Sequence, residues 1–138
     1  MTAVGKLMTC DVVCADMDIT LGAAMELCTE KRIRHLPILD EYKQLVGMVT
    51  DRDLRYHLSP RIGTLAENKS DREILGHPIH LIMRHTVVVA SADTSVAEAA
   101  QLMLANRVGC LPIVNLGRHV VGIVTTTDLL RCLAESQL

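Results

Sequence analysis

The sequence is poor in aromatic residues and has no long hydrophobic run. Two tyrosines are present among 138 residues, and tryptophan and phenylalanine are absent. Stacking platforms for single-stranded nucleic acid are therefore missing, and a formal net charge of −2 gives no attraction for a phosphate backbone. Both properties argue against nucleic-acid binding.

No apolar run approaches the roughly 20 residues of a membrane span, so we expect a soluble, cytoplasmic protein that does not bind membranes.

Cysteine occurs five times, an odd number, mostly within apolar segments. This placement favours buried thiols in a reducing compartment over a disulfide framework. Cys10 and Cys14 are four residues apart, but no second cysteine pair completes a zinc-binding pattern. His77, His80 and His85 have no acidic residue in register, which favours a solvated linker over a metal site. We therefore expect no metal, and a redox or metal sensor built on these residues is kept only as an alternative.

The dominant feature of the chain is an internal repeat. The stretch GMVTDRDL at 47–54 returns as GIVTTTDL at 122–129. Thr50 and Thr125 are 75 residues apart (125 − 50), as are Asp53 and Asp128 (128 − 53), so the two copies align without a gap. Such a repeat determines the architecture before local propensities are considered. With 49% hydrophobic residues, the chain suits one compact domain or two small domains that share a core.

Each copy predicts the same order of elements. Thr20 is a plausible N-cap, and apolar residues then recur at i, i+3, i+4 and i+7, as on one face of a helix. In the second copy Ser95 and Glu98 form a capping-box pattern. For the first copy we expect a strand, a helix, two strands and a helix at 12–14, 21–31, 34–39, 45–49 and 51–58. For the second copy we expect them at 87–89, 96–106, 111–114, 120–124 and 126–134.

The predicted fold class is therefore α/β (α+β), with two β-α-β-β-α repeats at 1–58 and 79–138. Their apolar strands are buried most easily against each other, around a pseudo-twofold axis. Residues 59–78 are predicted to be a linker, with at most a helical turn near 71–75. The charges of this linker are expected to form a solvated face.

The repeated segments, 33–38 with 45–54 and 108–113 with 120–129, resemble the CBS domain, a regulatory module named after cystathionine β-synthase. The tandem pair resembles a Bateman module. This resemblance implies a module that binds an adenosine-containing ligand, such as AMP, ADP, ATP or S-adenosylmethionine, in the cleft between the paired domains. It also implies a conformational signal to an effector protein.

The resemblance also implies roles for individual residues. Asp53 and Asp128 match the acids that hold ribose hydroxyls, and Thr50 and Thr125 match the hydroxyl residues beside them. A site in this family usually takes its acid from one repeat and its base-contacting segment from the other, which gives two pseudo-equivalent sites. The remaining candidate ligand-binding residues are Ile33, Arg34, His35, Val108, Gly109, Cys110, Arg52, Thr127, Val13 and Val88.

The two turns differ in chemistry. Arg52 can clamp a phosphate with its fork of donors, whereas Thr127 offers only a hydroxyl. We therefore expect the two sites to differ in affinity. Thr-x-x-Asp is also a capping-box variant, so a purely structural role for both turns stays open. Capping and ligand binding can coexist, because an aspartate has two oxygens.

Nothing in the sequence indicates catalysis: no nucleophile lies beside a base, and no glycine elbow or phosphate loop is present. We therefore expect neither an enzyme nor a required cofactor. Apolar residues in the predicted short helices exceed what a small monomer needs, which favours a homodimer. These residues are Leu54, Leu58, Leu129, Leu130 and Leu133. A structural dimerisation module without a ligand is the main alternative function.

Overall fold

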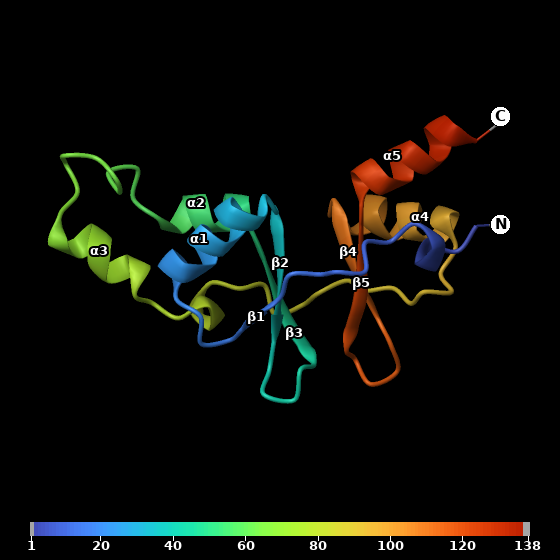
Figure 1. Ribbon diagram of the computed structural model, residues 1–138, viewed down its shortest axis with the longest axis horizontal. Coiled ribbons are helices and arrows are strands. Elements are labelled where there is room, and N and C mark those ends of the chain that lie inside the picture. The colour runs from blue at the N-terminus through green and yellow to red at the C-terminus, as the bar shows by residue number, and fades with distance from the viewer. Residues whose placement is uncertain (1, 137–138) are drawn as a thin grey trace. The chain divides into compact units, whose positions relative to one another are not determined.

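The computed structural model describes residues 2–136, which form two compact units (Figure 1). One unit consists of residues 13–87. The other joins the N-terminal residues up to Val12 to the segment that begins at Val88. Each unit has its own hydrophobic core.

The first unit contains a three-stranded sheet in the order β1-β2-β3. Strands β2 and β3 form the predicted antiparallel hairpin, and β1 pairs with β2 in parallel. Thr20 caps the first helix by accepting a hydrogen bond from the Ala23 N–H at 3.1 Å, as predicted. The elements are β1 (Ala15–Asp16), α1 (Leu21–Lys31), β2 (His35–Leu39), β3 (Leu45–Thr50), α2 (Asp51–His57), α3 (Lys69–Leu75) and a 3-10 turn (Ile79–Leu81).

The second unit repeats the hairpin and both flanking helices. Ser95 caps α4 by accepting a hydrogen bond from the Glu98 N–H at 3.1 Å, which confirms the predicted helix start. Both α1 and α4 end at an arginine in the left-handed conformation, Arg32 and Arg107. The elements are a 3-10 turn (Val4–Lys6), α4 (Val96–Asn106), β4 (Cys110–Val114), β5 (Val120–Thr125) and α5 (Thr126–Glu135).

The predicted first strand of each repeat was wrong in position. In the first repeat the strand is Ala15–Asp16 rather than 12–14. In the second repeat residues 87–89 are not a strand, and the corresponding pairing is a single parallel bridge between Ala90 and Ile113. A short apolar run has no periodicity from which its register can be read. Packing against β2 and β4 selects the residues that pair.

The N-terminal segment packs on the hairpin of the second repeat, although it begins the first repeat in the sequence. The Val4 N–H donates to the Thr94 carbonyl at 2.8 Å. Thr9 and Ile123 exchange two backbone hydrogen bonds of 2.9 Å. In Figure 1 the first turn of the chain, in dark blue, lies beside α4. Val4 is fully buried in the core of this unit.

The first residues of the second repeat pack on the hairpin of the first repeat in the same register. The Ile79 N–H donates to the Ile19 carbonyl at 2.7 Å, and Arg84 pairs with Met48. Ile79 is fully buried in the core of the first unit. A short segment therefore covers each hairpin. The two segments are equivalent in the repeat, because Val4 and Ile79 are 75 residues apart (79 − 4).

The predicted solvated linker was wrong in one respect. Residues 69–75 form the full helix α3, and Asp71 on this helix is only 2% exposed. Its carboxylate receives two hydrogen bonds from Arg61, which satisfies a charge that burial would otherwise disfavour.

The five leucines predicted to form a dimer surface differ in burial, and Leu129 is partly buried against the core of the second unit. Leu54 and Leu58 lie in the core of the first unit, with exposures of 2% and 9%, as their helical spacing predicts. Their inclusion in a dimer surface was therefore wrong. Leu130 and Leu133 on α5 are 60% and 55% exposed. Among residues 2–136, no helix has the length and apolar character required to cross a membrane.

Candidate functional site

Each repeat has a polar turn where the second hairpin strand runs into a helix. In the first repeat, Thr50 ends β3 and is the N-cap of α2. Thr50 Oγ1 accepts from the Asp53 N–H at 3.0 Å, and Asp53 Oδ2 accepts from the Thr50 N–H at 3.0 Å. This reciprocal pair is a capping box, so the capping interpretation is confirmed for this turn.

In the second repeat, Asp128 holds Thr125 through a single oxygen. Asp128 Oδ2 accepts from the Thr125 N–H at 2.8 Å and from the Thr125 hydroxyl at 3.2 Å. Thus Oδ2 serves the helix start in both repeats, and Oδ1 is left for other partners.

The two aspartates differ in what their second oxygen contacts. Asp53 Oδ1 accepts a hydrogen bond of 3.1 Å from Nη2 of Arg84. Asp128 Oδ1 lies 3.6 Å from Nη1 of Arg131, one turn along its own helix. Burial raises the pKa of Asp53, but the hydrogen bonds from Arg84 and the Thr50 backbone outweigh burial, and the net pKa is lowered. Asp53 is therefore a stable carboxylate at neutral pH.

The segment before each Leu-Pro lies against the turn of its own repeat. The Asp51 N–H donates to the Arg34 carbonyl at 3.0 Å, and His35 faces Thr50 in the β2-β3 ladder. In the second repeat, the Gly109 carbonyl accepts from the Thr126 N–H at 3.0 Å and from its hydroxyl at 3.3 Å. Within each repeat, the structure therefore brings the candidate base-contacting segment next to the candidate ribose acid.

His35 and Cys110 occupy equivalent positions in the two repeats. Burial lowers the pKa of His35, while Asp51 acts in the opposite direction. Burial raises the pKa of Cys110 to about 12, with Asp128 acting in the same direction. At neutral pH we expect a neutral imidazole and a protonated thiol. Cys110 is therefore a poor nucleophile and a poor redox sensor.

The other predicted residues divide into apolar and polar sets. The apolar residues are partly buried against the core of their own unit; these are Val13, Ile33, Val88 and Val108. The polar residues are exposed at the turns, where a ligand can reach them; these are Arg34, Arg52 and Thr127.

A profile of the CBS domain matches residues 4–60 and 79–135, which together include both turns and most of the chain. The chain belongs to the CBS domain family. A CBS domain-containing protein of Dictyostelium discoideum is 35% identical over 134 residues, covering 96% of this chain and 91% of that protein.

Solved structures of CBS domain pairs have the same fold. The pair of protein MJ0100, in complex with 5′-methylthioadenosine and S-adenosyl-L-methionine, has a TM-score of 0.82 at 27% identity and covers 99% of both chains. CBSX2 in complex with AMP has a TM-score of 0.81 at 26% identity and covers 98% of both chains.

Segments similar to this chain also occur within longer proteins that are named as enzymes. The homoserine O-acetyltransferase of Methanohalobium evestigatum is 29% identical over 134 residues, and the chain spans 24% of its length. Several of these curated relatives, unlike the Dictyostelium protein, are thus three to five times longer than the part they share with this chain.

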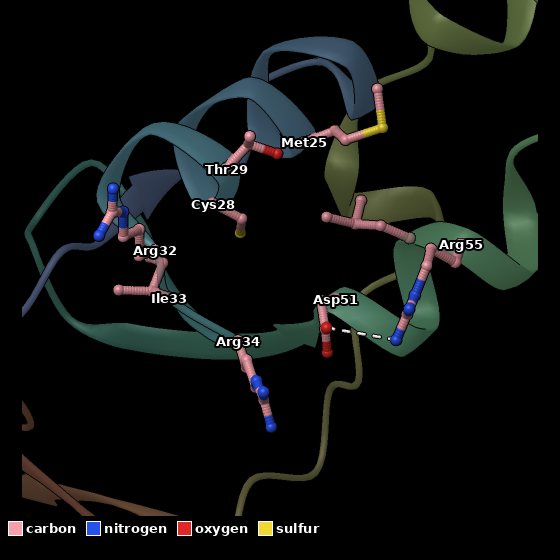
Figure 2. Close-up of a pocket in the computed structure, with 9 residues that line it drawn as sticks. Met25, Cys28, Thr29, Arg32, Ile33, Arg34, Asp51 and Arg55 are labelled. Atoms are coloured by element: carbon pink, nitrogen blue, oxygen red, sulfur yellow. Dashed lines mark hydrogen bonds and ion pairs between the residues drawn. The ribbon is translucent and has the colours of Figure 1, made fainter.

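A groove of about 460 Å³ lies beside the turn of the first CBS repeat (Figure 2). Its walls come from α1 and α2, and three arginines are among its lining residues. Arg55 contacts Asp51 at 3.3 Å along α2, on one side of the groove, whereas Arg34 points away from α1. The sequence did not predict this groove. Its lining residues are Met25, Cys28, Thr29, Arg32, Ile33, Arg34, Asp51, Leu54 and Arg55.

Sequence reasoning also missed Arg84, which contacts the candidate ribose acid from 31 residues away. A comparison of the two copies could have identified it. The residue 75 positions earlier (84 − 75) is Thr9, and both residues pair with the second strand of a hairpin. An arginine that replaces a threonine at such a position is a visible departure from the repeat.

The cysteines and histidines do not form a metal site in the described part of the chain. No group of three or more histidine, cysteine or acidic side chains in that part could hold a metal ion. The five cysteines are free thiols, with Cys10 exposed, and burial raises the pKa of Cys14.

Proposed function

We propose that this CBS domain pair is a regulatory module that binds an adenosine-containing ligand and transmits its occupancy to a partner protein. The complexes of the MJ0100 pair with 5′-methylthioadenosine and S-adenosyl-L-methionine, and of CBSX2 with AMP, support this ligand class. Neither turn offers an activated nucleophile, which also favours ligand binding over catalysis.

The proposal rests mainly on the Asp128 carboxylate, whose two oxygens have different partners. One oxygen, Oδ2, holds the start of α5, and Oδ1 contacts only Arg131, at 3.6 Å, among the hydrogen bonds and ion pairs of the described residues. A carboxylate held in this way can accept hydrogen bonds from ribose hydroxyls without losing its capping role. We assign Asp128 as the main ribose acid, with Asp53 as a second site.

The residues around the acids complete the proposed sites. Val108, Gly109 and Cys110 would face the base from one repeat, and Ile33, Arg34 and His35 from the other. Exposed Gly109 has no side chain, so a ligand can approach its backbone closely. Arg52 and Arg34 are exposed cations near the first turn and would contact phosphates. Val13 and Val88 would contribute apolar contacts.

Regulation requires that the ligand bind two states of the protein with different affinities. We propose a homodimer as the element that changes, because Leu130 and Leu133 on α5 remain largely exposed. The same leucines support the second candidate function, a dimerisation module without a ligand. In either case the chain acts through its surfaces and not as an enzyme.

A thermal-shift screen of the purified chain tests the proposal. The compounds are adenosine, AMP, ADP, ATP and S-adenosylmethionine, with GTP as a control for the base. A ligand at one hundred times its dissociation constant stabilises the folded state by about 2.7 kcal/mol, which corresponds to a rise of several degrees in Tm. A rise with an adenosine compound but not with GTP is expected. No rise with any compound would favour the dimerisation module.

A further inference from the structure

Arg84 is fixed to the first CBS repeat by its backbone. Its carbonyl accepts from the Met48 N–H at 3.0 Å, and its N–H donates to the Met48 carbonyl at 2.9 Å. Met83, next to it, is buried in the core of the same unit. The backbone of Arg84 is thus held in place, while its side chain is 55% exposed and has a long flexible stem.

The guanidinium of Arg84 occupies the oxygen that a ligand needs. It donates to Asp53 Oδ1 at 3.1 Å, while Oδ2 accepts from the Thr50 N–H at 3.0 Å. Both oxygens of Asp53 therefore have a protein partner. A ribose hydroxyl that binds Oδ1 must share this oxygen with Arg84 or displace the guanidinium.

The second CBS repeat is a built-in control, because the same backbone pairing holds a threonine. Thr9 and Ile123 exchange two hydrogen bonds of 2.9 Å, as Arg84 and Met48 do. A threonine has neither the charge nor the length of an arginine. Asp128 Oδ1 is left with Arg131 at 3.6 Å.

Other positions around the first turn carry the same difference in charge. Each of these arginines has a neutral residue 75 positions later: Arg34 with Gly109, Arg52 with Thr127, and Arg55 with Leu130. The first turn also has one more acid, since Asp51 corresponds to Thr126, and Arg55 pairs with Asp51 at 3.3 Å. Arg34, Arg52 and Arg84 still give the surroundings of Asp53 more cations than those of Asp128, whose carboxylate faces Arg131 at 3.6 Å. Coulomb attraction therefore favours an anionic group on a ligand more strongly beside Asp53 than beside Asp128.

We propose that Arg84 determines the specificity of the Asp53 site, so that this site takes a nucleoside phosphate in preference to a neutral nucleoside. A neutral nucleoside that engages Asp53 leaves Arg84 without its acceptor. A nucleoside phosphate engages Asp53 with its ribose and provides a phosphate as the new acceptor for Arg84. The Asp128 site has Thr9 at the position of Arg84 and makes this distinction less strongly. This inference rests on the proposed function, since it requires that Asp53 bind ribose.

The experiment is calorimetric titration with AMP and with adenosine. It uses Asp128→Asn protein, which reports on the Asp53 site, with and without Arg84→Thr. The threonine is the residue that the second repeat carries at this position. We expect Asp128→Asn protein to bind AMP about tenfold or more tightly than adenosine, as expected for a charged hydrogen bond. With Arg84→Thr the ratio should approach one, and adenosine should bind more tightly than before.

The reciprocal change is Thr9→Arg in Asp53→Asn protein, which reports on the Asp128 site. It should create a preference for AMP over adenosine. Arg84→Lys should retain part of the preference, because it keeps the charge but loses the fork of donors. A merely structural role for Arg84 would lower the Tm of Arg84→Thr protein and leave the ratio of the two affinities unchanged.

Each failure has a distinct meaning. A preference for AMP that persists in Arg84→Thr protein overturns the role of Arg84 and leaves the proposed function intact. The role of Arg84 is also overturned if Asp128→Asn protein binds neither compound while Asp53→Asn protein binds both. If the unsubstituted chain binds no adenosine compound, the proposed function fails and the inference fails with it.

Discussion

Arg61 donates two hydrogen bonds to Asp71, from Nε to Oδ2 at 3.0 Å and from Nη2 to Oδ1 at 2.9 Å. Asp71 Oδ2 also accepts from the Asn68 N–H at 3.0 Å, which caps α3. The hydrogen bonds from Arg61 lower the pKa of Asp71 well below its usual range, although burial acts in the opposite direction. Asp71 and Arg61 thus form an ion pair that joins two parts of the connecting segment, residues 59–78.

The first prediction concerns the pH dependence of stability. A group whose pKa is lowered by folding stabilises the folded state above its unfolded pKa of about 3.9, and this contribution is lost as the pH falls below that value. We expect Asp71→Asn protein to be less stable than the unsubstituted chain at pH 7. We also expect it to lose less stability on acidification to pH 3, because one titrating group has been removed.

Urea denaturation at the two pH values measures this effect. Glu73→Gln is the matched control, because Glu73 is an exposed acid on the same helix. The role of the Arg61–Asp71 pair is contradicted if Asp71→Asn and Glu73→Gln proteins show the same pH dependence.

The second prediction concerns the close contact between each hairpin and the segment that covers it. A Cβ at Gly47 would overlap the sulfur of Met83, and a Cβ at Gly122 would overlap the sulfur of Met8. Gly47→Ala and Gly122→Ala should each cost about 1–3 kcal/mol in the free energy of unfolding, as expected for overpacking. Gly76→Ala is the control, because its Cβ would meet only the Glu73 carbonyl, at an ordinary 3.5 Å.

Chemical denaturation at pH 7 gives these free energies. Equal costs at all three glycines would show that the methionines move aside freely. The packing of the covering segments would then contribute little to stability.

The third prediction concerns self-association through α5. Leu130→Glu should convert a dimer to a monomer, because it places a charge on the more exposed of the two largely exposed leucines of this helix. Light scattering measures the mass. Leu116→Glu is the control, because Leu116 is equally apolar and fully exposed in the β4-β5 turn. A mass that does not change in Leu130→Glu protein argues against this interface.

The sequence was sufficient to predict the elements that repeat with strong periodicity or clear caps. Thr20 and Ser95 placed the starts of α1 and α4, because a side-chain oxygen before an apolar helical pattern has few other uses. The hairpins followed from two apolar runs joined by a short polar turn. Both turns with Thr50 and Thr125 were placed correctly, since strand and helix patterns meet there.

The sequence could not predict the contacts between a segment of one copy and the hairpin of the other copy. The segments that begin at Val4 and Ile79 have the same pattern, and the hairpins that they cover are also alike. Sequence alone therefore could not tell which segment covers which hairpin. Asp71 was misjudged for a similar reason, because its burial depends on Arg61, ten residues earlier in an irregular segment.

The candidate site was predicted in part. The acids and hydroxyl residues were identified from the repeat, and their capping role was foreseen. The ion pair between Arg84 and Asp53 was missed because no local pattern connects residues 31 positions apart. The two aspartates occupy equivalent positions, but only Asp53 accepts a hydrogen bond from Arg84. This contact distinguishes the two turns more clearly than the difference between Arg52 and Thr127.

The most direct test of the proposed function is calorimetric titration of adenosine into the unsubstituted chain, Asp128→Asn protein and Asp53→Asn protein. Asparagine retains an oxygen that can accept from the Thr125 N–H, so α5 should stay capped. Loss of a charged acceptor at the ribose should weaken binding roughly tenfold to hundredfold in Asp128→Asn protein. Asp53→Asn should change the affinity little, because Arg84 already occupies that acid. Unchanged affinity in Asp128→Asn protein would contradict the assignment of Asp128 as the main ribose acid.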